Sequence, residues 1–110
     1  MKWNAYARGK RPERGQNKTE KAYAQQLELE MRANEIEWYK FEGIKLRMGK
    51  GAWFTPDFIV MRKTGEIEIH EVKGFMREAA NVRLKVAAEM YPFPIYVVRL
   101  KNNRWNNEKI

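Results

Sequence analysis

Apolar residues recur every three or four positions near the start of the chain, between about residues 18 and 33. Tyr23, Leu27 and Met31 form one stripe at this spacing, and most side chains between them are polar or charged. Residues three or four apart lie on the same side of an α-helix. The pattern therefore predicts an amphipathic helix over residues 18–33.

The middle of the chain changes to the period of two that is typical of β-strands. Residues 44–48 alternate apolar and basic side chains, and Gly49-Lys50-Gly51 predicts a turn into residues 52–61. A glycine-containing connection at residues 63–66 joins that run to residues 67–72. We expect a three-strand meander with antiparallel neighbours.

The remaining segments complete an α/β pattern. Residues 35–39 predict a short extended segment or turn, and residues 77–90 predict a second helix. The main apolar line of this helix consists of Ala79, Val82, Val86 and Met90. Residues 95–100 are almost continuously apolar, which favours a strand inside the sheet, and residues 101–110 form a polar C-terminal tail. The expected order is helix, three strands, helix, strand.

Length and charge limit the functions that the chain can have. Its 110 residues suffice for one core, expected over residues 17–100, but not for separate catalytic and specificity domains. The net charge of +8 favours polyanions, and nucleic acid above all, as partners. Residues 1–16 are strongly basic and aperiodic, which predicts a mobile arm. The arm is either a solubilising tail or a DNA contact, and its candidate DNA-binding residues are Lys10, Arg11 and Arg14.

Cysteine is absent, and His70 is the single histidine, so zinc sites built from thiolates or several histidines are excluded. A hard metal ion held by oxygen ligands remains possible. No run approaches the roughly 20 apolar residues that span a bilayer, and the first residues lack an apolar signal core. We expect no membrane partner and a cytoplasmic location.

Two carboxylates and one ammonium stand out because the predicted hairpin brings them together. Asp57 is the only aspartate, and Glu71-Val72-Lys73 is the only triplet in which an acid is followed two residues later by lysine. Pairing across the turn places Asp57 opposite Glu71 to within about one residue, and strand alternation puts Glu71 and Lys73 on one face. This arrangement is typical of a Mg²⁺ site with a lysine beside it.

Simpler interpretations stay open at this point. Asp57 could be an ordinary acid at a strand start, and Glu71 with Lys73 could be a surface ion pair. Ile67 and Ile69 share the predicted face of Glu71 and Lys73, however, which indicates a buried row in which unpaired charge is costly.

Glu20 and His70 each have a competing explanation. Glu20 lies on the apolar stripe of the first helix, where a metal ion or a cation would compensate its burial. Asn17 three residues earlier also fits a capping box, which explains Glu20 without any function. Alternation turns His70 away from the carboxylates, and we expect it to be a surface or second-layer residue.

The element order, with Pro56-Asp57 opening one strand and Glu71-Val72-Lys73 closing the next, resembles the PD-(D/E)xK nuclease superfamily. Its fold is the restriction-endonuclease-like type of α/β domain. More narrowly, the chain is similar to small phage-encoded nucleases related to Holliday-junction resolvases. That similarity covers Glu20, Ala22-Tyr23, Leu27, residues 32–36, Pro56-Asp57-Phe58, residues 71–75 and residues 83–85.

The resemblance implies a cofactor and roles for individual residues. Mg²⁺ would be the metal, with Mn²⁺ able to substitute, and Asp57 and Glu71 would ligate it through carboxylate oxygens. Glu20 and the main-chain carbonyl of Val72 would be further ligands. Lys73 would lie beside the attacking water. The resemblance thus implies four catalytic residues, namely Glu20, Asp57, Glu71 and Lys73.

The second helix adds two basic candidates for DNA contact. Nucleases of this superfamily often place a basic residue of this helix near the site, which favours Arg83 and Lys85, although a solvated helix face explains both equally simply. The virus-type replication-repair branch adds a glutamine after the Glu-x-Lys strand, but this chain has no glutamine after Gln26.

We therefore expect a Mg²⁺-dependent DNA endonuclease that selects branched or otherwise structured DNA. Junction resolution needs two active sites and hence a homodimer. An interface could come from four aromatic residues, Trp38, Tyr39, Phe41 and Trp53, which could equally be core. The alternatives are a monomeric nicking or end-processing nuclease and a non-catalytic, basic nucleic-acid-binding protein. If phage-encoded, the protein would act in the host cytoplasm.

Overall fold

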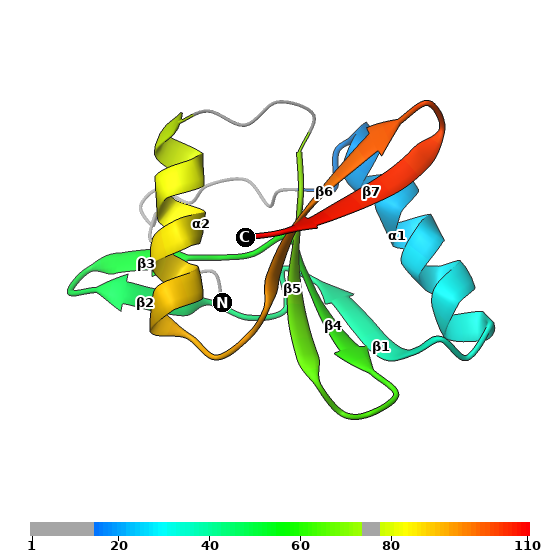
Figure 1. Cartoon of the computed structure of the whole chain (residues 1–110), viewed down its shortest axis with the longest axis horizontal. Helices are drawn as coiled ribbons and strands as arrows, with labels where there is room; N and C mark the ends of the chain where they lie inside the picture. Colours follow the sequence, from blue (N-terminus) through cyan, green and yellow to red (C-terminus); the bar gives the residue numbers. More distant parts are fainter. Residues whose placement is uncertain (1–14, 74–77) are drawn as a thin grey trace.

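The computed structural model describes residues 15–73 and 78–110, which form two helices and seven strands. In chain order these are α1 (Lys18–Arg32), β1 (Ile36–Phe41), β2 (Leu46–Gly49), β3 (Ala52–Phe54), β4 (Phe58–Arg62), β5 (Ile67–Val72), α2 (Glu78–Met90), β6 (Ile95–Lys101) and β7 (Arg104–Lys109). Five strands form one sheet in the order β1-β4-β5-β6-β7, while β2 and β3 pair separately (Figure 1). Among the strands that the structure describes, β5 and β6 are the one parallel pair, and the other neighbours are antiparallel. The domain is α/β with a mixed sheet.

The two helices cover opposite faces of the five-stranded sheet (Figure 1). On one face, α1 contributes Tyr23 and Leu27 to a buried cluster with sheet residues Phe58, Val60, Val72 and Val98. On the other face, α2 and the β2–β3 hairpin contribute Leu84, Ala87, Leu46 and Phe54 to a cluster with Ile59, Ile69, Ile95 and Val97. The sheet therefore has a core on each side. Strand β5 contributes to both cores through its alternating side chains.

The first helix agrees with its predicted pattern. Tyr23 and Leu27 are buried, and Met31 packs against the same cluster. The helix ends where Asn34 takes a left-handed conformation (φ 68°), which asparagine tolerates better than most residues. Within residues 15–73 and 78–110, no helix has the length and apolar character needed to cross a membrane.

The predicted meander is wrong in one respect. The run over residues 52–61 is broken by Pro56, which has no N–H to donate to a strand partner, so β3 ends at Phe54 and β4 begins at Phe58. Strands β2 and β3 form a hairpin outside the main sheet. The strand next to β4 in the main sheet is therefore β1 at residues 36–41, and not the strand predicted at residues 44–48. For residues 35–39 the sequence predicts only a short extended segment or turn.

The predicted apolar line of the second helix is wrong at Val82, Val86 and Met90, while the side chain of Ala79 lies outside the described part of the chain. Val82, Val86 and Met90 are between 40% and 54% exposed, whereas Leu84 and Ala87 are buried. Two residues correspond to about 200° around a helix, so a shift from Val82 to Leu84 turns the helix nearly halfway round. Because α2 carries apolar residues on two sides, its pattern alone does not determine which side is buried.

The C-terminal residues form a strand and not a tail. Strand β7 pairs antiparallel with β6, and the paired residues run from Tyr96 opposite Lys109 to Lys101 opposite Arg104. The two-residue turn between them is Asn102-Asn103, with φ values of 51° and 60°. Two successive left-handed residues are typical of a type I′ hairpin turn. As predicted, β6 is an internal strand, because it lies between β5 and β7.

Candidate active site

Asp57 and Glu71 lie side by side where β4 begins and β5 ends. Phe58 pairs with His70 in the antiparallel register, so Asp57, which precedes Phe58, lies opposite Glu71, which follows His70. The main-chain N–H of Asp57 donates to Glu71 Oε1 (2.6 Å), and the N–H of Val72 donates to Asp57 Oδ2 (2.9 Å). The predicted juxtaposition is confirmed. Each acid therefore accepts a hydrogen bond from the opposite strand.

The hairpin turn fixes this register. The N–H of Arg62 donates to the carbonyl of Glu66, and the N–H of Gly65 donates to the carbonyl of Arg62. Gly65 has φ 95°, a conformation that costs a residue with a side chain far more than glycine. Since strand side chains alternate, a slip of one residue would turn Glu71 to the opposite face.

Burial gives the carboxylate pair unusual electrostatics. Asp57 is 6% exposed and Glu71 is 5% exposed. Burial, together with the neighbouring Asp57 charge, raises the pKa of Glu71 to about 7, although the N–H of Asp57 and the Lys73 ammonium act in the opposite direction. Near neutral pH, Glu71 is therefore poised between its charged and its neutral form.

Lys73 lies at the edge of the carboxylate pair. Its Nζ is 3.7 Å from Glu71 Oε2, and its side chain is 28% exposed. The ammonium thus reaches from the buried pair toward solvent. This position suits a group that acts on a substrate bound in front of Glu71.

The parallel strand β6 places another cation next to Lys73. Glu71 pairs with Val97, Val72 pairs with Val98, and the N–H of Lys73 donates to the carbonyl of Val98 (2.9 Å). The next residue of β6 is Arg99, so Lys73 and Arg99 are neighbours on adjacent strands, which lie about 4.8 Å apart. Arg99 was not among the predicted site residues, although its spacing of two from Val97 places both side chains on one face of the sheet.

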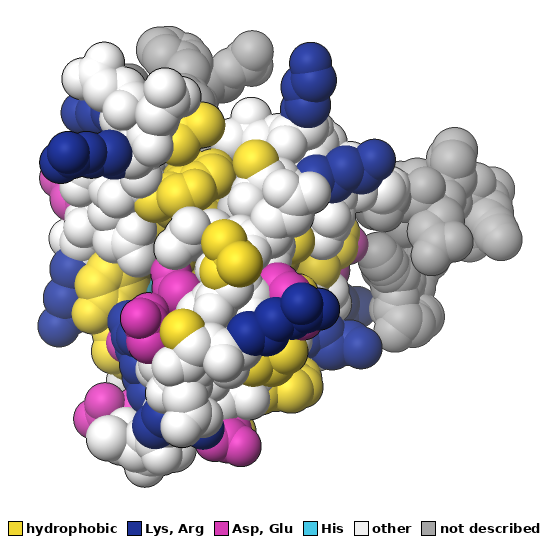
Figure 2. Space-filling view, turned by 90° about the vertical axis from the view of Figure 1, so that its right-hand side faces the viewer, with side chains coloured by type: hydrophobic (Ala, Val, Ile, Leu, Met, Phe, Trp, Pro, Cys, Tyr) yellow, Lys and Arg dark blue, Asp and Glu magenta, His cyan; other side chains and the backbone are white. Residues whose placement is uncertain are grey.

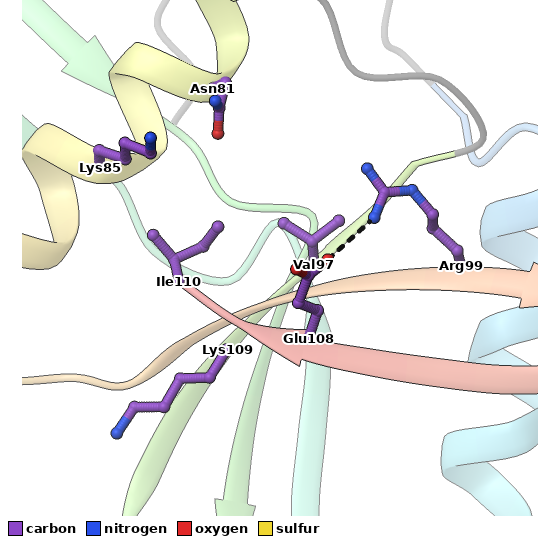
Figure 3. A pocket seen from close by; sticks show the side chains of 7 residues that line it. All are labelled: Asn81, Lys85, Val97, Arg99, Glu108, Lys109 and Ile110. Carbon is purple, nitrogen blue, oxygen red and sulfur yellow. Dashed lines mark hydrogen bonds and ion pairs between the residues drawn. The ribbon is translucent and has the colours of Figure 1, made fainter.

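A pocket of about 640 Å³ opens on this face of the sheet (Figure 3). It lies between α2 and the β6–β7 hairpin. Its polar lining consists of Asn81 and Lys85 from α2, Arg99 from β6, and Glu108 and Lys109 from β7. Three of these five side chains are cationic and one is acidic, which favours an anionic ligand.

The basic residues predicted on α2 have different surroundings. Lys85 lines the pocket, whereas the Arg83 guanidinium lies 6.0 Å from the ring centroid of Phe54 on β3. Lys10, Arg11 and Arg14 lie outside the described residues. On the face shown in Figure 2, cations are interspersed with acidic and apolar side chains and do not form one basic patch. Among the candidates that the structure describes, Lys85 is the one placed at the pocket.

Glu20 forms the capping box of α1. Its Oε1 accepts from the N–H of Asn17 (3.0 Å), and its own N–H donates to Asn17 Oδ1 (2.8 Å). Glu20 is also 3% exposed, as its place on the apolar stripe predicted. Over residues 15–73 and 78–110, no three His, Cys, Asp or Glu side chains are grouped as a metal site. The structure thus brings Asp57 and Glu71 together without adding Glu20 to them.

His70 belongs to a buried network on the opposite face of β5. Its Nδ1 lies 2.6 Å from the hydroxyl of Tyr23, and its Nε2 lies 2.9 Å from Glu68 Oε1. Arg62 Nε donates to Glu68 Oε2 (2.8 Å). The expected second-layer position is confirmed and a surface position is excluded, since His70 is only 2% exposed. The network links α1 to the sheet.

The donor set at Asp57 and Glu71 fits Mg²⁺. This ion prefers oxygen ligands and is usually held by one or two carboxylates, with water and substrate phosphates completing its octahedron. Two neighbouring buried carboxylates repel each other when both are charged, and a divalent cation would relieve that repulsion. The main chain of Val72 is adjacent to the two carboxylates, because its N–H donates to Asp57 Oδ2.

Comparisons with protein-family models, curated proteins and solved structures found no match to this chain.

Proposed function

We propose that the protein is a Mg²⁺-dependent DNA endonuclease whose active site consists of Asp57, Glu71 and Lys73. The observation that carries this proposal is the buried carboxylate pair with an ammonium 3.7 Å from one of its oxygens. Buried charges are costly unless they have a partner, and groups with strongly shifted pKa values concentrate at functional sites. The net charge of +8 supports a polyanionic substrate.

The fold supports the same proposal. Elements α1, β1, β4, β5, α2 and β6 follow the order of helix, three strands, helix and strand that the PD-(D/E)xK resemblance implies. We propose that they are a restriction-endonuclease-like core, with the β2–β3 hairpin as an insertion and β7 as an added edge strand. In that core the two acids lie at the ends of neighbouring strands, as Asp57 and Glu71 do.

Each residue has a defined task in phosphodiester hydrolysis. Asp57 and Glu71 would hold the metal ion, and the Val72 carbonyl is a further candidate ligand. When bound, Mg²⁺ would supply positive charge that stabilises the phosphate in the transition state, and it would lower the pKa of water. Lys73 orients the attacking water and stabilises the negative charge that develops on the phosphate oxygens. Glu71 must give up its proton for the site to be active.

The substrate is proposed to be branched or otherwise structured DNA, because the chain lacks room for a separate domain that reads sequence. Junction resolution requires a homodimer. Of the four aromatic residues considered for an interface, Tyr39 and Phe41 pack against the core cluster, while Trp38 and Trp53 are at least 40% exposed. Molar mass in solution distinguishes the dimer from a monomeric nicking or end-processing enzyme.

A non-catalytic nucleic-acid-binding protein is the second candidate. The reciprocal bonds of Asp57 and Glu71 to main-chain N–H groups favour it, because they give both acids a structural task. Cleavage separates the two functions. A labelled four-way junction, a flap and a linear duplex are incubated with the protein, with Mg²⁺ or with EDTA. Strand cleavage of any of them only with Mg²⁺ supports the endonuclease, and binding without cleavage supports the alternative.

A further inference from the structure

We propose that the pocket between α2 and the β6–β7 hairpin binds a DNA phosphate next to the one that is cut. We further propose that Glu108 holds Arg99 in place of that phosphate when DNA is absent. This inference rests on the proposed function and adds a specific substrate contact to it. The pocket residues that carry it are Lys85, Arg99 and Glu108.

Strand pairing relates the pocket to the carboxylate pair across three strands. Glu71 on β5 pairs with Val97 on β6, and Val97 pairs with Glu108 on β7. Arg99 lies two residues beyond Val97 and therefore on the same face, next to Lys73. A DNA strand with one phosphate at Glu71 and Lys73 would pass directly over Arg99.

The cations suit phosphate better than a neutral ligand. The guanidinium of Arg99 can donate two parallel hydrogen bonds to phosphate oxygens, and Lys85 adds a compact positive charge from α2. Asn81, also on α2, is a neutral donor in the same lining. Figure 3 shows these side chains around the opening, with the ammonium of Lys109 directed away from Arg99.

The ion pair between Arg99 and Glu108 is weak enough to exchange. A single Arg99 nitrogen lies 3.3 Å from Glu108 Oε1, which is longer than the 2.7–2.9 Å typical of a charge-assisted bond. The Glu108 side chain is 71% exposed, so water screens the attraction. A phosphate that engages Arg99 bidentately would displace this carboxylate.

The test measures DNA affinity in EDTA, so that binding is independent of cleavage. Fluorescence anisotropy with a labelled four-way junction and a labelled linear duplex compares the full-length chain with Arg99→Gln, Lys85→Gln and Glu108→Gln. Lys63→Gln and Glu37→Gln are matched controls, because Lys63 and Glu37 form another surface ion pair (3.0 Å) and Lys63 lies in the β4–β5 turn. Thermal melting checks that each variant is folded.

We expect Arg99→Gln and Glu108→Gln to change DNA affinity in opposite directions. Arg99→Gln should weaken binding about tenfold, and each lost phosphate contact should reduce the slope of log K against log salt by about 0.9. Lys85→Gln should change affinity in the same direction. Glu108→Gln should tighten binding by about two- to fivefold, because it removes the competing carboxylate. The two control variants should each change affinity by less than about twofold.

Other outcomes overturn the inference. If Glu108→Gln weakens binding as Arg99→Gln does, the pair is structural. If the pocket variants bind like the controls while the wild type cleaves DNA, the phosphate site is wrong and the endonuclease stands. If the opposite shifts appear but Mg²⁺ produces no cleavage, the phosphate site stands and the endonuclease is wrong. Absence of DNA binding by the wild-type chain contradicts both.

Discussion

The N–H of Asp57 donates to the carboxylate of Glu71 over 2.6 Å, and the carboxylate of Asp57 accepts from the N–H of Val72 on the same strand as Glu71. Each acid thus fixes the backbone that carries the other. Once Glu71 is deprotonated, the arrangement holds two negative charges together in a buried place, where they repel each other. Folding therefore creates a site that a divalent cation would stabilise.

Metal affinity should depend on pH through Glu71. Its pKa is raised to about 7, and Mg²⁺ bound as proposed would compete with the proton for the same carboxylate. Apparent affinity should fall roughly tenfold per pH unit below 7 and level off above 8. Calorimetric titration with Mg²⁺ at pH 6 and pH 8 measures this. Equal affinities at both values would show that Glu71 is not a ligand.

In the absence of metal, the raised pKa of Glu71 should make the protein less stable as pH rises, whereas Mg²⁺ affinity should increase with pH. The folded state keeps the Glu71 proton up to about pH 7, whereas the unfolded chain loses it near its ordinary value of 4.5. The free energy of unfolding should therefore fall as pH rises from 4.5 to 7. Glu71→Gln should remove this fall. Denaturant titrations in EDTA supply the matched comparison.

Lys73→Ala should reduce the cleavage rate by about a hundred- to a thousandfold with little change in Mg²⁺ affinity. In the proposed mechanism, the ammonium stabilises the transition state and does not ligate the metal. Lys73→Arg should recover little activity, because a planar guanidinium does not replace a compact charge. Single-turnover cleavage at saturating DNA measures the rate, with Lys63→Ala as the control. A near wild-type rate for Lys73→Ala would show that Lys73 has no part in catalysis and only forms an ion pair with Glu71.

Glu20 can be tested by two substitutions. Glu20→Gln keeps the oxygen that accepts from Asn17, so melting should stay unchanged and cleavage should stay within about threefold of wild type. Glu20→Ala removes the side-chain oxygen that accepts from the N–H of Asn17, which is one of the two bonds of the capping box, and should cost about 1 kcal/mol of stability. A large loss of activity in Glu20→Gln with unchanged melting would instead restore Glu20 as a metal ligand.

The Glu68 network should contribute to stability in a pH-dependent way. Burial raises the pKa of Glu68, but the bonds from His70 and Arg62 outweigh it and hold the pKa at about 2. The folded state therefore favours the charged form, and this stabilisation is present above about pH 4.5 and lost as pH falls toward 2. Glu68→Gln should cost about 1–3 kcal/mol at pH 7.

The difference between wild type and Glu68→Gln should narrow below pH 4.5, as measured by denaturant unfolding across that range. Glu66→Gln is the control, because Glu66 is exposed in the adjacent turn. A difference that stays constant from pH 7 to pH 2.5 would contradict the role given to the charge of Glu68.

The local part of the site could be predicted from the sequence. Asp57 and Glu71 are joined by one short hairpin, so turn length and strand alternation suffice to place them opposite each other. The α1 stripe was equally clear, because Tyr23 and Leu27 belong to a single apolar face.

The long-range part could not be predicted. Whether Arg99 lies near Lys73 depends on which strand pairs with β5, and this pairing is made through the α2 crossover. Strand β7 was missed because Arg104–Lys109 is mostly polar, as suits an edge strand that is largely exposed. The asparagines of its turn were the available signal. The side of α2 that is buried was ambiguous because Val82 and Leu84 are both apolar.

Cleavage by charge-removing variants that keep the fold tests the central claim most directly. Asp57→Asn and Glu71→Gln retain an oxygen for the N–H groups of Val72 and Asp57, so both variants should melt at or above the wild-type temperature. With Mg²⁺ and saturating DNA, the account predicts that each cleaves at least about a thousandfold more slowly than wild type. Wild-type cleavage by either folded variant would contradict the account.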